Sequence, residues 1–135
     1  MSPSPSQFAP QVLAAVAVGG AGGAVCRYVL SVLVTRLFGH GFPWGTLAVN
    51  LLGALLMGML IEAAALRWSL GPLPRALLVV GFLGGFTTFS TLSLDMVTLI
   101  ERQQVVLAVV YATVSVGLGV AALFGGLSLV RWLLG

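Results

Sequence analysis

Four apolar stretches, each long enough to cross a lipid bilayer, take up most of this chain. They cover residues 11–37, 45–66, 76–100 and 105–133, with short polar or Gly/Pro-containing connectors between them. An α-helix rises about 1.5 Å per residue, so about 20 residues span the ~30 Å hydrocarbon core. Only 7% of the residues are charged, whereas soluble domains carry about 25%. The sequence therefore predicts an all-α integral membrane protein with four transmembrane helices per subunit.

The N-terminal segment differs from the rest in composition. Residues 1–10 are rich in Pro and Ser, carry no charged side chain and lack the basic start of a signal peptide. We expect residues 1–10 to form a disordered lead and residues 11–135 to form a single four-helix transmembrane domain. The only cysteine, Cys26, excludes an internal disulfide.

The third apolar stretch contains a segment that differs from its surroundings. Residues 81–93 read GFLGGFTTFSTLS and combine glycines, hydroxyl groups and phenyl rings. Glycine weakens an α-helix, and Ser and Thr side chains compete for backbone hydrogen bonds. Lipid cannot satisfy the freed backbone groups, so such a segment is expected to be buried against protein as a binding site, an ion path or a hinge. We predict that the third helix is broken here.

The basic residues, all arginines, are almost evenly divided between the two sides of the membrane. With four helices, both termini lie on one side, together with Arg67, Arg75 and Arg131; Arg36 and Arg102 lie on the other, with Arg27 inside the first helix but nearer that face. An excess of Lys and Arg normally fixes orientation. The balanced distribution favours insertion in both orientations over a single one, which would allow an antiparallel homodimer.

The first helix carries a glycine motif and a charge. Gly19 and Gly23 form a GxxxG pair, which serves either packing within the chain or contact between subunits. An arginine at the bilayer centre costs at least ~2.5–3.5 kcal/mol. Arg27 is therefore expected to face protein or water, or to extend to the headgroups. In a water-filled vestibule it would attract anions.

Polar side chains also occur in the second and fourth helices. Thr46 and Asn50 are one turn apart, and so are Tyr111 and Ser115. Either pair could simply hold helices together. For Asn50, the polar segment of the third helix favours a role in a pathway, because its amide brings two N–H donors into an apolar helix.

Enzymatic catalysis has little support in this sequence. The only histidine, His40, lies in a predicted loop, and Glu62, Asp95 and Glu101 have no Cys or His partner at metal-ligand spacing. No nucleophile–base pair and no basic nucleic-acid patch can be identified. A proton-coupled four-helix drug exporter needs an intramembrane carboxylate, typically in its first helix, which this chain lacks. That exporter and a non-conducting membrane subunit are the alternatives to an ion channel.

Three motifs resemble, in order, those of the fluoride channel family called Fluc or CrcB. Residues 19–28 (GGAGGAVCRY) resemble its GGxxGAxxRY opening, residues 43–53 (PWGTLAVNLLG) its second-helix signature, and residues 81–91 (GFLGGFTTFST) its third. The resemblance covers nearly the whole chain from Gly19 onward. It implies a dual-topology, antiparallel homodimer in the plasma (inner) membrane of a prokaryote-like cell. Such a dimer has two pores that passively export fluoride from the cytoplasm, and a structural sodium ion at its centre.

The resemblance also implies roles for particular residues. Asn50 matches the pore asparagine, and Phe89 matches the first pore phenylalanine, whose ring edge is partly positive and can face an anion. The implied fluoride pathway comprises Thr46, Asn50, Thr88, Phe89, Thr91, Leu92, Tyr111 and Ser115, with Arg27 at its vestibule. Gly84 and Thr87 match the positions whose main-chain carbonyls hold the sodium ion, and we expect Gly84 to tolerate a side chain poorly.

One position departs from the family pattern. The family usually reads TTFSTFS, whereas residues 87–93 read TTFSTLS, so that Leu92 replaces the second pore phenylalanine. Either one ring per pore suffices here, or conduction is weakened, or the chain is an engineered variant. Asp95 stands where many relatives have glutamate.

The even distribution of arginines leads to a test of topology. Cysteines introduced at Ser69 and at Gln103, which lie in connectors at opposite ends of the helices, should each be labelled from both sides of the membrane in whole cells. Two lysines added to the N-terminus should shift the labelling toward one side. Strictly one-sided labelling at both positions in the parent chain would show that the orientation is single.

Overall fold

The structure, a computed structural model, describes residues 6–135, and all its regular elements are helical. The first two membrane-crossing helices are α1 (Pro10–Phe38) and α2 (Trp44–Ala63), which continues into a π-helical turn, η1 (Ala64–Trp68). The third comprises α3 (Pro72–Arg75), η2 (Ala76–Leu83), α4 (Gly84–Phe86) and, after a break, α5 (Ser90–Glu101). The fourth is α6 (Val105–Leu134). Each of the four is long and apolar enough to span a membrane, so the predicted four-helix architecture and the break in the third helix are confirmed.

The helix boundaries deviate from the predicted ones mainly at the start of the third helix, which begins at Pro72 instead of near residue 76. A proline suits the first turn of a helix because its missing N–H would have no partner there. The predicted disordered lead falls partly on residues 1–5, which lie outside the described residues, and α1 already includes Pro10.

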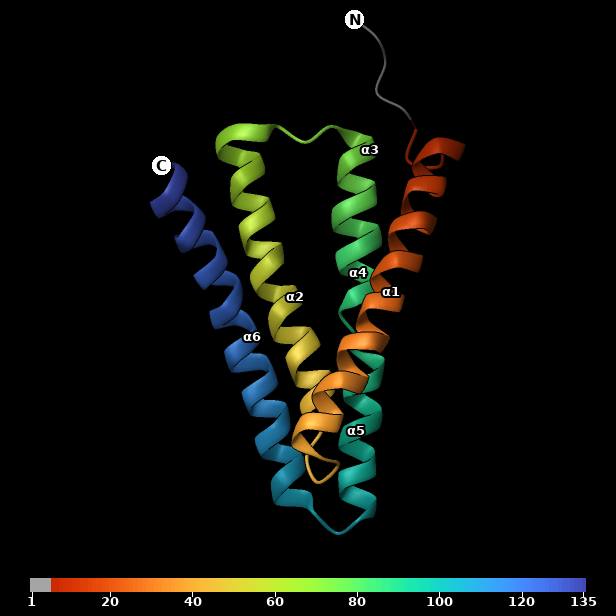
Figure 1. The fold of residues 1–135 in the computed structure, drawn as a ribbon, viewed down its shortest axis with the longest axis vertical. Coiled ribbons are helices and arrows are strands. Elements are labelled where there is room, and N and C mark those ends of the chain that lie inside the picture. The colour runs from red at the N-terminus through yellow and green to blue at the C-terminus, as the bar shows by residue number, and fades with distance from the viewer. Residues whose placement is uncertain (1–5) are drawn as a thin grey trace, which may run out of the picture.

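The helices converge at one end of the molecule and splay apart at the other (Figure 1). The C-terminus, the N-terminal end of α1 and the segment joining η1 to α3 lie at the splayed end, and the α1–α2 and α5–α6 loops lie at the converging end. Arg67 in η1, Arg75 in α3 and Arg131 in the last turn of α6 are therefore at one end. Arg36, in the last turn of α1, is at the other, as the sequence predicted.

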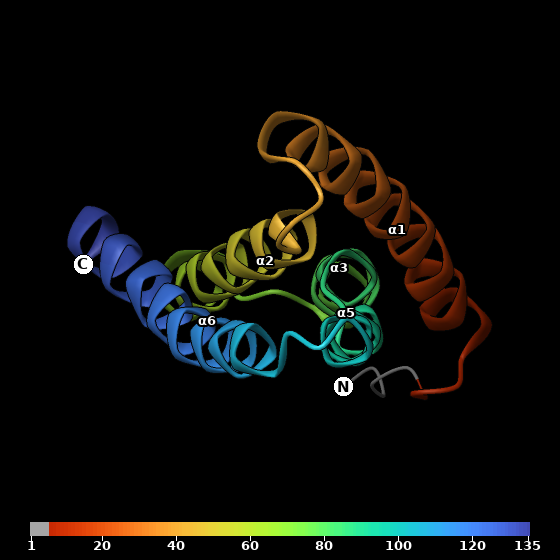
Figure 2. The ribbon, with the colours of Figure 1, turned by 90° about the horizontal axis from the view of Figure 1, so that it is seen from below.

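Two helix pairs form the body of the fold: α2 packs against α6, and α1 packs against η2 and α4. Figure 2 shows the third helix end-on, with α3 and α5 nearly superimposed, so the chain keeps its direction through the break. Glycines allow the close approach within each pair. A Cβ at Gly23 would overlap Phe82 O, and one at Gly58 would overlap Leu123 O. The GxxxG pair of α1 therefore serves packing within the chain.

Few side chains are fully buried, and most of those at the converging end form one cluster. Its buried members are Leu47, Leu99, Ala108 and Tyr111. At the splayed end, Arg131 Nε donates to Glu62 Oε1 at 3.0 Å and so joins α6 to α2. Many large apolar side chains along the four helices remain exposed, as expected for surfaces that face lipid or another subunit.

The packing of α1 against the third helix can be tested with two adjacent glycines. A methyl group at Gly23 would overlap Phe82 O and lie 2.9 Å from Phe86 N, whereas at Gly22 its nearest neighbour would be Phe82 Cδ2 at 3.6 Å. We expect Gly23→Ala to lower the stability by roughly 1–3 kcal/mol, as overpacking does. Gly22→Ala should be neutral or slightly stabilising, because alanine favours helix. Thermal unfolding in detergent would measure both, and equal stabilities would contradict this packing.

Candidate functional site

The break in the third helix lies between Phe86, the last residue of α4, and Ser90, the first residue of α5. Thr87 is extended there, with φ −86° and ψ 157°. Its N–H and its hydroxyl group both donate to Leu83 O, at 3.0 and 2.9 Å. A helix end leaves backbone groups without their usual partners, so the stability of the break depends on what replaces them.

Asn50 on α2 supplies the main hydrogen-bond partners for the backbone groups at the break. Its Nδ2 donates to Thr88 O at 3.0 Å, and Thr88 N donates to Asn50 Oδ1 at 2.8 Å. The side-chain amide thus satisfies both polar groups of one residue at the break, and only one orientation of the carboxamide does so. Because the amide nitrogen carries two hydrogens, one N–H remains for another acceptor. Asn50 holds helices together, as one interpretation of the sequence proposed, and still has a donor to offer.

Two further side chains complete the hydrogen bonding around the break. Arg27 Nε donates to Gly85 O at 3.1 Å, so this arginine faces protein inside the membrane-crossing region. The Thr88 hydroxyl accepts a hydrogen bond from Thr91 N at 3.1 Å, as an N-cap residue does at the start of a helix. Backbone groups freed by the break are therefore met by side chains from α1, α2 and the break itself.

A pocket of about 510 Å³ lies beside the break and is called the break pocket below. It contains five of the eight predicted pathway residues together with both predicted sodium-binding residues: Asn50, Thr88, Phe89, Leu92, Ser115, Gly84 and Thr87. The Phe89 side chain is largely free, with 80% of the residue exposed. Ser115 also lines this pocket, but its Oγ is buried and has no hydrogen-bond partner among the described residues. Leu92 also packs against the buried cluster.

The other predicted pathway residues lie farther toward the converging end. A middle pocket of about 290 Å³ is lined by Arg27, Ser31, Thr46, Thr88 and Thr91, among others. It shares Thr88 with the break pocket. An outer pocket of about 310 Å³ shares Ser31, Thr46 and Thr91 with the middle pocket. The three pockets follow one another from the converging end to the break, and threonines are among the residues that neighbouring pockets share.

Tyr111 lies apart from the pockets that the other predicted pathway residues line. It is fully buried and lines none of these three pockets. Its hydroxyl donates to Asp95 Oδ2 at 3.0 Å, and Asp95 lines the outer pocket. The connection of Tyr111 to the proposed route is therefore indirect, through the carboxylate that it holds.

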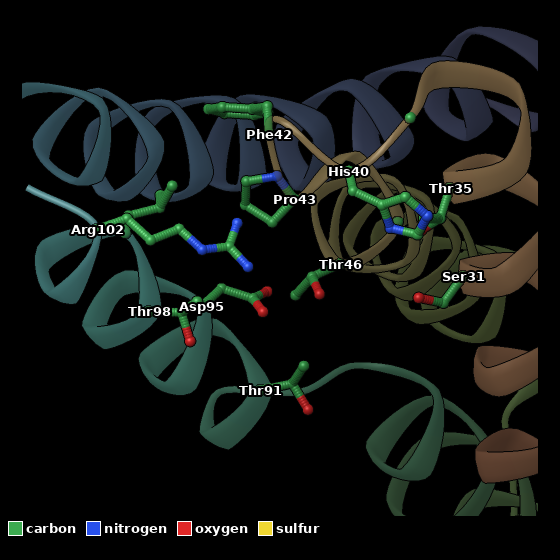
Figure 3. A pocket seen from close by; sticks show the side chains of 13 residues that line it. Ser31, Thr35, His40, Phe42, Pro43, Thr46, Thr91, Asp95, Thr98 and Arg102 are labelled. Atoms are coloured by element: carbon green, nitrogen blue, oxygen red, sulfur yellow. The ribbon is translucent and has the colours of Figure 1, made fainter. Parts of the chain in front are cut away.

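The outer pocket brings together polar residues that the sequence analysis did not assign to the pathway (Figure 3). They are Ser31, Thr35, His40, Asp95, Thr98 and Arg102. Figure 3 shows the side chains of Asp95 and Arg102 directed toward one another, with Ser31, Thr35 and His40 across the pocket. One signal was available for α1, since Arg27, Ser31 and Thr35 recur every fourth residue and must share a helix face.

The expected sodium ligands can be compared with the geometry of the break. Gly84 and Thr87 lie at the break, and their main-chain carbonyl oxygens are of the kind that binds a hard cation. A Cβ at Gly84 would meet only Val79 O, at an ordinary 3.7 Å. Within one chain a Cβ therefore fits at Gly84, and the expectation for bulkier side chains stays a prediction.

Comparison with known proteins gives consistent matches. The family model described as "CrcB-like protein, Camphor Resistance (CrcB)" matches residues 14–127. A Rhizobium etli protein named "Fluoride-specific ion channel FluC" is 48% identical over 116 residues, which cover 86% of this chain and 93% of that one. An Agrobacterium fabrum protein of the same name is 50% identical over 119 residues (88% and 95%). A Nitrobacter hamburgensis protein named "Fluoride-specific ion channel FluC 1" is 49% identical over 117 residues (87% and 93%).

The bond pair between Asn50 and Thr88 can be tested by removing the amide. Asn50→Leu keeps a similar volume but leaves Thr88 N and Thr88 O without their partners. Because an unsatisfied buried polar group costs about 1–3 kcal/mol, we expect a loss of at least that size in unfolding experiments in detergent. Ser115→Ala is the matched control, since its hydroxyl has no hydrogen-bond partner in the described part of the chain, and it should be nearly silent. An Asn50→Leu protein as stable as the parent would show that the break does not depend on this amide.

Proposed function

Because this chain belongs to the CrcB-like family, we propose that it is a passive, fluoride-selective channel. The observation that carries the proposal is the break pocket, whose lining includes two groups suited to an anion: the second N–H of Asn50 and the exposed ring of Phe89. The relatives described above, which bear the name of fluoride-specific ion channels, support the choice of ion.

The chemistry of the break pocket suits passage of a small anion better than its retention. Fluoride is strongly hydrated, so a pore has to replace water with hydrogen-bond donors. The break pocket offers neutral donors and a ring edge, and none of its lining residues is charged. Conduction requires sites that are favourable enough to enter and weak enough to leave, and neutral donors meet both conditions better than an arginine would.

The proposed route reaches the break pocket through the outer and middle pockets. Arg102 lines the outer pocket and Arg27 the middle one, and positive charge in a cleft raises the local concentration of anions. Beyond these charges, Thr46, Thr91 and Thr88 follow one another along the route. Their hydroxyl groups can take over from hydration water one at a time.

The proposal includes a second copy of the chain in the opposite orientation. The break pocket is incomplete in one copy, because Phe89 is 80% exposed and Val116 64% exposed at its edge. An antiparallel partner could cover these residues, and the balanced arginines would allow both orientations. In the inner (plasma) membrane of a prokaryote-like cell, such a dimer would export fluoride. HF crosses the membrane and ionises inside, so a passive path for the ion clears it from the cytoplasm.

We expect a structural sodium ion at the dimer axis, held by the main-chain oxygens of Gly84 and Thr87. Thr87→Ser should be nearly silent for folding and dimer formation, because the carbonyl is kept and a serine hydroxyl can still donate to Leu83 O. A bulky residue at Gly84 should weaken the dimer, although a single chain has room for a Cβ there. A high-resolution map that shows a water with ordinary hydrogen-bond distances between these carbonyls would reject the ion.

Ion efflux from liposomes tests the proposed function. Purified protein should release fluoride and retain chloride, without a proton gradient. Efflux that requires a proton gradient would favour the drug-exporter alternative. No efflux from well-folded protein would favour a non-conducting subunit.

Phe89 is the one aromatic residue in the lining of the break pocket, so its replacement tests whether fluoride passage needs a ring edge. Phe89→Ile removes the only phenyl edge that lines the break pocket, so fluoride efflux should fall by about fivefold or more, the equivalent of one ring contact. Leu92→Phe adds a ring at the pocket edge and should preserve or raise efflux, provided the ring fits without strain. Both variants would be compared with the parent at equal protein density in liposomes. Parent-like efflux by Phe89→Ile would show that ring edges are not required.

A further inference from the structure

The outer pocket combines charged side chains with a histidine. It is lined by hydroxyl groups, by the oppositely charged Asp95 and Arg102, and by His40 from the α1–α2 loop. His40 is exposed, and it is the only histidine in the chain. Figure 3 places its imidazole across the pocket from Asp95 and Arg102.

The net charge of the residues that line this pocket depends on whether His40 is protonated. The carboxylate of Asp95 on α5 and the guanidinium of Arg102, directly after the end of α5, cancel. Helices α1 and α2 contribute only neutral side chains to the lining, and α6 reaches the pocket indirectly through the bond from Tyr111 to Asp95. Arg36 and Glu101, at the same end of the molecule, are exposed and do not line it. The net charge of the lining is therefore zero with a neutral His40 and positive with a protonated one.

We propose that His40 controls fluoride access to the route in a pH-dependent way, an inference that rests on the proposed channel function. Histidine is the side chain whose charge changes between about pH 5 and 8. A cleft lined by positive charge concentrates anions and speeds their association. Protonation of His40 makes the outer pocket an anion collector, and its deprotonation removes this advantage. Conduction thus rises at acidic pH. At acidic pH more HF crosses the membrane, so more fluoride has to leave the cell.

The experiment is a measurement of fluoride current through purified protein in planar bilayers at fixed voltage, with equal pH on both sides. Current is the suitable readout because HF is neutral and carries none. When the pH is lowered from about 8 to about 5.5, the parent current should rise about threefold. This increase is smaller than the largest effects that charged clefts have on association rates. His40→Gln should stay at the low level at both pH values, and His40→Arg should stay at the high level at both. Arg36→Gln, which removes a nearby charge outside the pocket, should keep the rise.

The outcomes separate this inference from the function on which it rests. A pH-independent current in the parent, or a rise that persists in His40→Gln, overturns the role of His40 and leaves the channel in place. Loss of the rise in Arg36→Gln also overturns it, because the effect would then come from surface charge in general. The absence of any fluoride current in the parent overturns the proposed function and the inference with it.

Discussion

The two hydrogen bonds between the Asn50 carboxamide and the backbone of Thr88 are the interaction on which the rest of the site depends. A helix break at membrane depth is costly, because lipid offers no hydrogen bonds to the freed backbone groups. Here α2 supplies the carboxamide of Asn50, which has the same donor and acceptor as a peptide group. Arg27 on α1 donates a hydrogen bond to Gly85 O. With these partners in place, the third helix can be interrupted and still continue in the same direction, as Figure 2 shows.

The same interruption creates the chemistry that we assign to the site. It turns the Phe89 ring out of the fold and places Asn50 at the wall of a pocket with Ser115. Holding helices together and lining a pathway are therefore compatible roles for Asn50. One amide hydrogen serves the first role, and the other is left for the second.

The sequence predicted the features that depend on local composition. Four helices follow from apolar length, and the break follows from glycines and hydroxyl groups in residues 81–93. The early start at Pro72 was missed because proline marks both turns and first helical turns. The resemblance to the channel family assigned Tyr111 to the route, and in the structure its hydroxyl donates to Asp95, a contact that the sequence did not indicate. The outer pocket joins α1, a loop, α2 and the third helix, and single-helix patterns do not show which side chains from separate elements converge.

The central claim, that Asn50 both holds the break and donates to the permeating anion, is tested most directly by fluoride efflux from liposomes containing Asn50→Asp. The carboxylate can still accept the hydrogen bond from Thr88 N, so that part of the support for the break is kept. It has no N–H to offer and repels an anion when ionised. The account predicts a folded protein whose fluoride efflux is steeply reduced. Parent-like efflux from well-folded Asn50→Asp protein would contradict it and would leave Asn50 with a purely structural role.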